Sequence, residues 1–140
     1  MKIVLDTNCF LAILPKKSAY RPIFDAYRKG IFELIISTEI LSEYSEIFAE
    51  KMTPEIADNL AELILKQHNT VKIEVYFHWG LITQDYDDNK FIDAAIASNA
   101  DFFVTSDGHF KILKSIPFPK VKVISLGEFL VILNKTNSPF

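Results

Sequence analysis

The chain has 140 residues, of which 49% are hydrophobic and 24% charged, and its formal net charge is −3. This composition fits one globular domain with a substantial core and excludes an intrinsically disordered chain. The negative charge argues against a basic nucleic-acid scaffold, although it does not exclude a nuclease, because bound divalent cations offset an acidic cluster. The single cysteine, Cys9, excludes a disulfide framework and a cysteine-built metal site.

The chain starts with Met-Lys and enters a short apolar segment at once, so no signal peptide is visible. No apolar segment approaches the roughly 18 residues of a membrane-spanning helix. We therefore expect a cytoplasmic protein with no membrane partner.

The first predicted element is a buried strand that ends at a carboxylate. Residues 2–5 (KIVL) are a short apolar run typical of parallel sheets covered on both faces, and Asp6, Thr7 and Asn8 follow. Ligands of open α/β sheets bind at the carboxyl ends of the strands, which makes Asp6 a candidate site residue. The alternative is a turn in which Asp6 is a turn acid and Thr7 and Asn8 cap the next helix.

A helix is predicted from about residue 19 to residue 29, and it ends at Gly30, a favourable residue after a helix C-terminus. Its apolar stripe includes Tyr20, Phe24 and Tyr27, and such a stripe is more typical of a core than of a base-stacking surface. Apolar side chains on the early helices, these three included, exceed what one core stripe needs. We therefore predict a homodimer.

A second strand is predicted over residues 32–36, and Thr38 is a candidate N-cap for a helix that continues to about Lys51. Proximity to the carboxyl end of this strand favours Glu39 or Glu43 as a site residue, and Glu43 lies nearer the apolar side. The alternative is a row of solvated glutamates. That row consists of Glu39, Glu43, Glu46 and Glu50.

Another helix opens at Thr53 and Pro54, because threonine suits the N-cap and proline the first helical position. Residues 71–75 alternate as a strand and lead into an aromatic connection. In that connection, His78 and Trp79 either line a substrate groove or pack beneath the loop.

Residues 121–124 predict a last strand and residues 126–133 a short closing helix. We expect one domain over residues 1–133 and a loose C-terminal tail over residues 134–140. Because strands alternate with helices along the chain, the pattern predicts a mainly parallel sheet with helices on both faces.

The most informative stretch runs from Asp85 to Asp107. It opens with acids where a helix begins, and residues 102–105 (FFVT) predict a buried strand that ends near Asp107. At about 100° per residue, Asp88 falls on the apolar side of the helix between them, whereas Asp93 falls about 140° away and is expected to face out. Asp88 is therefore either a ligand at the edge of the sheet or a carboxylate that caps the helix and complements its dipole.

Four acids, Asp6, Glu43, Asp88 and Asp107, lie at element ends that a parallel sheet brings to one edge. Crowded carboxylates repel one another and are costly to desolvate, and hard divalent cations relieve that cost. Oxygen ligands suit Mg²⁺ or Mn²⁺, which activate water and stabilise a leaving oxygen. The sequence contains no cysteine–histidine cluster for zinc and no glycine-rich phosphate loop.

Two motifs resemble those of the PIN domain family. One is Asp6-Thr7-Asn8 after the MKIVL start, with Glu43 six residues after Ser37, and the other is DYDDNKF leading to NADFFVTSD at Asp107. The chain is similar to bacterial and archaeal PIN proteins that are the toxin components of toxin–antitoxin systems, the VapC-like ribonucleases. The resemblance covers roughly residues 1–130.

The resemblance implies a three-layer α/β/α fold with a five-stranded parallel sheet in the order 3-2-1-4-5. It also implies a Mg²⁺- or Mn²⁺-dependent endoribonuclease that acts on single-stranded RNA, with a protein antitoxin as partner. The family's acidic quartet, which binds the metal and carries catalysis, matches Asp6, Glu43, Asp88 and Asp107. Asn8 and Thr105 match supporting polar positions. The third acid has neighbouring alternatives, namely Asp85, Asp87 and Asp93.

Two other functions compete with the nuclease. One is a PIN-fold protein with weak or no catalysis that binds RNA or a protein partner, and the intact quartet argues against it. The other is a receiver-like phosphoacceptor domain, which needs paired acids after the first strand and a lysine after the last. Here Asp6 stands alone and Ser125 follows the last strand.

Overall fold

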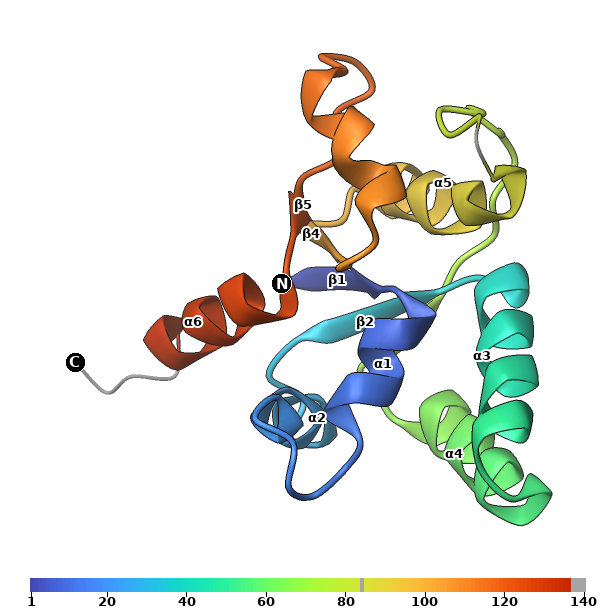
Figure 1. Ribbon diagram of the computed structural model, residues 1–140, viewed down its shortest axis with the longest axis vertical. Coiled ribbons are helices and arrows are strands. Elements are labelled where there is room, and N and C mark those ends of the chain that lie inside the picture. The colour runs from blue at the N-terminus through green and yellow to red at the C-terminus, as the bar shows by residue number, and fades with distance from the viewer. Residues whose placement is uncertain (84, 137–140) are drawn as a thin grey trace.

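The computed structural model describes residues 1–83 and 85–136. Its centre is a five-stranded parallel sheet in the order β3-β2-β1-β4-β5 (Figure 1). The strands are β1 (Lys2–Leu5), β2 (Glu33–Ile36), β3 (Thr70–Lys72), β4 (Phe102–Val104) and β5 (Val123–Ile124). The predicted parallel sheet and its strand order are confirmed.

Helices cover both faces of this sheet, so the predicted three layers are present. The helices are α1 (Thr7–Ile13), α2 (Arg21–Arg28), α3 (Thr38–Lys51), α4 (Pro54–Lys66), α5 (Asn89–Ser98) and α6 (Leu126–Thr136), with 3₁₀ segments η1 (Tyr86–Asp88) and η2 (Gly108–Ser115). In Figure 1, α5 and η2 lie on one side of the sheet and α1 to α4 on the other. Across the described part of the chain, no helix has the length and apolarity required to span a bilayer.

Local sequence explains where the long helices start and stop. Ser37, rather than the predicted Thr38, caps α3 by accepting a hydrogen bond from the amide of Ile40 at 3.2 Å. Thr53 caps α4 as predicted, and Pro54 follows it as the first helical residue. Asn99 ends α5 in the left-handed conformation, with φ at 52°. Ser37 directly follows β2, and Asn99 lies shortly before β4. The start of α3 and the end of α5 are therefore close to the sheet.

Several boundaries differ from the sequence prediction. Helix α2 begins at Arg21, because the Ser18 hydroxyl donates to the carbonyl of Ala12 and accepts from the amide of Tyr20, which holds the preceding turn outside the helix. Strand β3 ends at Lys72, and residues 73–83 are irregular. Helix α6 continues to Thr136, and residues 137–140 of the predicted tail lie outside the described residues.

The apolar surface that motivated the homodimer prediction is absent among the described residues of α2. Tyr27 and Phe24 are 1% and 6% exposed, because their rings pack against each other and Tyr27 also packs against Phe32. Tyr20 is partly buried. The expectation that these side chains form an exposed patch is therefore wrong, and the homodimer itself stays a prediction.

Candidate active site

Asp6 lies at the carboxyl end of β1 and is only 7% exposed. It occupies the N-cap position of α1, but among the described residues its side chain accepts from Thr105, with 2.7 Å between the Thr105 hydroxyl and Oδ2. Thr105 directly follows β4 and is also buried. The amide of Asp6 donates to the carbonyl of Val104 at 3.0 Å, so the two strand ends fix the carboxylate between them.

The environment of Asp6 is apolar and negative. Burial raises the pKa of Asp6 above its ordinary value, and the charges of Asp107 and Glu43 raise it further, against the lowering effect of the Thr105 hydrogen bond. Asp107 is linked to the same threonine, because its amide donates to the Thr105 hydroxyl at 3.0 Å. Its own carboxylate caps η2 by accepting from the amide of His109 at 2.9 Å.

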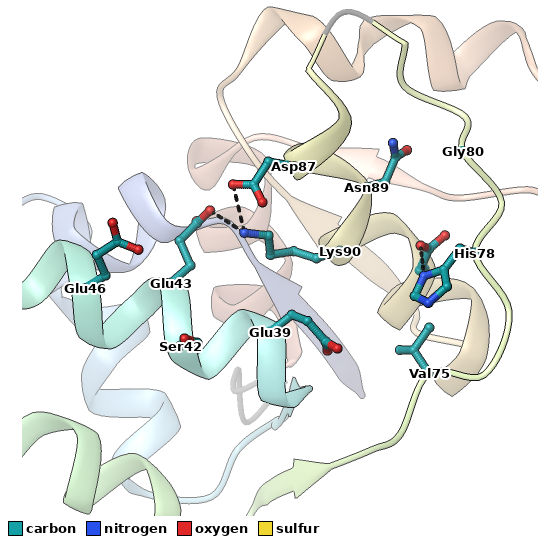
Figure 2. A pocket seen from close by; sticks show the side chains of 11 residues that line it. Glu39, Ser42, Glu43, Glu46, Val75, His78, Gly80, Asp87, Asn89 and Lys90 are labelled. Carbon is teal, nitrogen blue, oxygen red and sulfur yellow. Dashed lines mark hydrogen bonds and ion pairs between the residues drawn. The ribbon is translucent and has the colours of Figure 1, made fainter.

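Glu43 reaches this group from α3. The Tyr44 hydroxyl next to it donates to the carbonyl of Leu5, and this buried bond ties α3 to the end of β1. The Glu43 carboxylate accepts from the Thr7 hydroxyl and from the ammonium of Lys90, whose Nζ is 2.8 Å from Oε1. Figure 2 shows this lysine between Glu43 and Asp87, the latter 3.0 Å away. Glu43, rather than Glu39, is therefore the glutamate held toward Asp6.

Lys90 supplies a positive charge inside this acidic region. Its side chain is 13% exposed. Desolvation alone would lower its pKa, but the hydrogen bonds to Glu43 and Asp87 raise the pKa of Lys90 overall, so the ammonium stays protonated.

Asp88 lies on the other flank, at the start of α5. It occupies the N-cap position, but among the described residues its carboxylate contacts His109 instead of the first turn of the helix, with 3.2 Å between Oδ2 and Nδ1. Burial raises the pKa of Asp88, and the charges of Asp85 and Asp107 add to this effect. Ligand atoms of Asp88, Asp107 and His109 all lie within 4.8 Å of one another.

The structure thus gathers the four predicted acids at the carboxyl edge of the sheet. Asp107 links two groups, because it interacts with Asp6 on one side and with Asp88 on the other. The predicted Asn8 does not join them. It is exposed in the first turn of α1, and its side chain forms no hydrogen bond with the described residues.

The prediction that Asp93 faces out is wrong. Its side chain is 3% exposed, its Oδ1 accepts from the amide of Trp79 at 3.1 Å, and its Oδ2 lies 3.2 Å from Nδ1 of His78. Residues 73–83 return along α5 and cover this flank of the helix. Helical periodicity predicts only direction around one helix and does not reveal a distant segment that packs on it.

A pocket of about 450 Å³ opens on the Glu43 side of the acids, and Glu43 is the one member of the quartet that lines it (Figure 2). Its walls come from α3, from the loop after β3 and from the start of α5. It is lined by Glu39, Ser42, Glu43, Glu46, Val75, His78, Gly80, Asp87, Asn89, Lys90 and Asp93. Five of these side chains are acidic. A polyanion therefore approaches this pocket only if cations offset their negative charge.

The sequence analysis did not find three residues that contact the acids: Thr7, Lys90 and His109. Thr7 and Lys90 lie within the two quoted motifs, so the motifs could have marked them as candidate site residues. His109 follows Asp107 in what reads as a turn, and only the fold of η2 brings its ring back to Asp88.

The donor set fits a hard divalent cation. All four carboxylates lie at this edge. Among the described residues, the close group of ligand atoms consists of Asp88, Asp107 and His109, and Asp6 and Glu43 are connected to it through charge. Burial and mutual repulsion raise the pKa values of Asp6 and Asp88. Carboxylate oxygens are the preferred ligands of Mg²⁺ and Mn²⁺, and an added cation relieves this repulsion.

A three-layer α/β/α fold with a parallel sheet places the chain in the class of α/β proteins whose ligands bind at the carboxyl edge of the sheet, where the acids are gathered here. The PIN domain family model matches residues 2–109, which is most of the chain. The protein therefore belongs to the PIN domain family.

Two solved structures show the same fold. One is VapBC2 from Rickettsia felis bound to a DNA fragment from their promoter, with 21% identity, a TM-score of 0.63, and coverage of 89% of this chain and 98% of that chain. The other is DNA-bound VapBC from Salmonella typhimurium, with 14% identity, a TM-score of 0.56, and coverage of 90% and 98%. No curated protein matches the sequence significantly.

Proposed function

We propose that this protein is a metal-dependent endoribonuclease that hydrolyses phosphodiester bonds of single-stranded RNA. The observation that supports this most is that Asp6, Glu43, Asp88 and Asp107 lie at one edge of the sheet, where Glu43 also lines an open pocket. Membership of the PIN family and the acid-only character of the quartet agree with it.

In this proposal, Asp6, Glu43, Asp88 and Asp107 hold Mg²⁺ or Mn²⁺. The bound ion supplies an activated water and stabilises the leaving oxygen. Thr105 keeps the Asp6 carboxylate oriented through its 2.7 Å hydrogen bond, and Thr7 does the same for Glu43.

The two basic side chains at the site have a separate role. Lys90 and His109 contact the acids from opposite flanks, and the hydrogen bond to Asp88 and the charge of Asp107 raise the pKa of His109. We assign to both the task of limiting repulsion among the carboxylates before a phosphate arrives. Lys90 then also offers a positive charge to the phosphate, and His109 does so when it is protonated.

We further propose that the chain is the toxin of a toxin–antitoxin pair and binds a protein antitoxin. The similar structures of VapBC complexes support this. The competing candidate is a PIN-fold protein with weak catalysis that binds RNA or a partner. Co-expression with the neighbouring open reading frame, followed by co-purification, tests the partner separately from the chemistry.

The nuclease proposal is tested with single-site variants and an end-labelled single-stranded RNA. We expect Asp6→Asn, Glu43→Gln, Asp88→Asn and Asp107→Asn each to lower the cleavage rate at least about a hundredfold, the usual scale for a group that positions the reacting water. Asp58→Asn, at an exposed acid on α4, is the control and should cleave like the wild type. Equal rates in all five variants would point to a contaminating nuclease and defeat the assignment.

A further inference from the structure

Aromatic rings from two distant parts of the sequence meet on the surface. The ring of Trp79 lies 4.7 Å from that of Phe77 and 6.1 Å from that of Phe118, measured between centroids. Phe77 and Phe118 are 62% and 79% exposed, and neighbouring Tyr76 is 87% exposed. We call Phe77, Trp79 and Phe118 the aromatic cluster. It is not part of the hydrophobic core, because two of its three rings are mostly exposed to solvent.

The loop that carries Phe77 and Trp79 is fixed to α5 at two points. The buried carboxylate of Asp93 accepts from the amide of Trp79 at 3.1 Å. The buried amide of Asn89 bonds to both the N–H and the C=O of Ile82, each at 2.8 Å. Two buried polar residues therefore hold the aromatic loop in one place.

The loop that carries Phe77 and Trp79 continues toward the candidate active site. Loop residues 81–83 and η2 face each other across a hollow of about 140 Å³, which is lined in part by Thr83, His109 and Ile112. His109 in turn contacts Asp88 of the acidic group. An RNA strand that crosses this hollow from the aromatic loop reaches His109 and, next to it, Asp88.

The segment that carries Phe118 is positively charged, and this charge favours a nucleic acid over a protein as its partner. Residues 108–127 contain no acid but four exposed lysines, although the whole chain has a net charge of −3. These are Lys111, Lys114, Lys120 and Lys122. Lysine is depleted in the cores of protein interfaces, whereas aromatic rings interleaved with positive charge are typical of surfaces that bind single strands.

We infer that the aromatic cluster is a base-stacking platform that binds single-stranded RNA and leads it to the acidic site. Bases stack on Trp79 and Phe118, and the lysines of residues 108–127 attract the phosphates. Asp93 acts as a positioning residue, because it holds the backbone of Trp79. This inference rests on the proposed function, since it assigns the substrate path of the same site.

Trp79 is the only tryptophan in the chain, so its fluorescence reports directly on stacking. The experiment uses the full chain with Asp6→Asn, to prevent cleavage, in Mg²⁺. The probes are single-stranded RNA of about ten nucleotides, which lies within the usual range of site sizes, and an abasic strand of equal length. We expect RNA to quench the fluorescence to saturation and the abasic strand to leave it nearly unchanged.

Variants then locate the contact. Phe118→Ala should weaken RNA binding about tenfold, within the range expected for loss of one stacked base. Leu65→Ala, at a similarly apolar and 54% exposed position on α4, is the matched control and should bind normally. Asp93→Asn should weaken binding and shift the emission of Trp79, and a purely structural role elsewhere would not move that emission.

Some outcomes would overturn the inference. RNA that binds Phe118→Ala as tightly as the parent, without quenching Trp79, places the strand elsewhere. A doubled mass in light scattering that Phe118→Ala abolishes would instead make the cluster a protein interface. Neither result touches the nuclease proposal, because wild-type cleavage is measured separately.

Discussion

The ammonium of Lys90 lies 2.8 Å from Glu43 and 3.0 Å from Asp87, so one positive charge bridges α3 and the start of α5. His109 has the corresponding place beside Asp88 and Asp107, at 3.2 Å and 3.6 Å. The acidic cluster therefore contains two basic side chains of its own, the Lys90 ammonium and the His109 imidazole. A divalent cation that binds the acids takes over part of their role.

The first prediction concerns Lys90→Met, which keeps the length of the side chain and removes its charge. Without divalent cations we expect the free energy of unfolding to fall by about 1–2 kcal/mol, between the values for exposed and fully buried ion pairs. Excess Mg²⁺ should reduce this loss, because the cation supplies the missing charge near Glu43. Urea unfolding with and without Mg²⁺ measures both values.

Lys66→Met is the matched control for this prediction. Lys66 pairs with Glu62, but both side chains are mostly exposed, at 74% and 60%. Its loss should be smaller than about 0.5 kcal/mol and independent of Mg²⁺. A loss in Lys90→Met that Mg²⁺ leaves unchanged would contradict the idea that lysine and metal share one role.

The second prediction concerns Asp6→Asn in the absence of metal. Asparagine still accepts the hydrogen bond from Thr105 but removes a buried charge that Asp107 and Glu43 repel. We expect stability to rise by about 1 kcal/mol at neutral pH, or roughly 4 °C in Tm. Scanning calorimetry checks this, and a variant less stable than the wild type would count against a repelled carboxylate.

The third prediction is the pH dependence of that difference. The pKa of Asp6 is raised in the folded state, so the folded protein binds more protons than the unfolded chain between the ordinary and the raised pKa. The contribution of Asp6 therefore favours folding at low pH and is lost as the pH rises through the raised pKa. The advantage of Asp6→Asn should vanish in acid and reach its full size at neutral pH, as unfolding curves across this range will show.

The sequence predicted the sheet, its order and the acids at its edge, because those features follow from buried strands, element ends and a family motif. It did not predict the partners that hold the acids. Thr105 and Asp6 are 99 positions apart, and Lys90 and Glu43 are 47 apart. Contacts between residues so far apart in the sequence depend on how the helices and strands pack. The local sequence pattern does not reveal that packing. The prediction that Asp93 faces out was wrong for the same reason, because the irregular segment 73–83 covers its side chain.

The fourth prediction separates Asp88 from Asp93. Asp88→Asn should abolish cleavage and leave stability nearly unchanged, because its side chain contacts His109 at the surface of the site. Asp93→Asn should lose about 1–2 kcal/mol, because its buried carboxylate bonds to the amide of Trp79. It should retain the maximal cleavage rate and show a higher KM. The reverse pattern, with Asp93→Asn inactive at saturating RNA, would move the metal toward Asp93.

The most direct test of the central claim is metal removal and replacement during cleavage of one end-labelled single-stranded RNA. Purified wild-type protein should stop cleaving in excess EDTA and recover its full rate when Mn²⁺ is restored. Asp107→Asn from the same purification should stay inactive in both conditions. Cleavage that persists in EDTA, or that is equal in wild type and Asp107→Asn, would contradict a metal-dependent nuclease built on these acids.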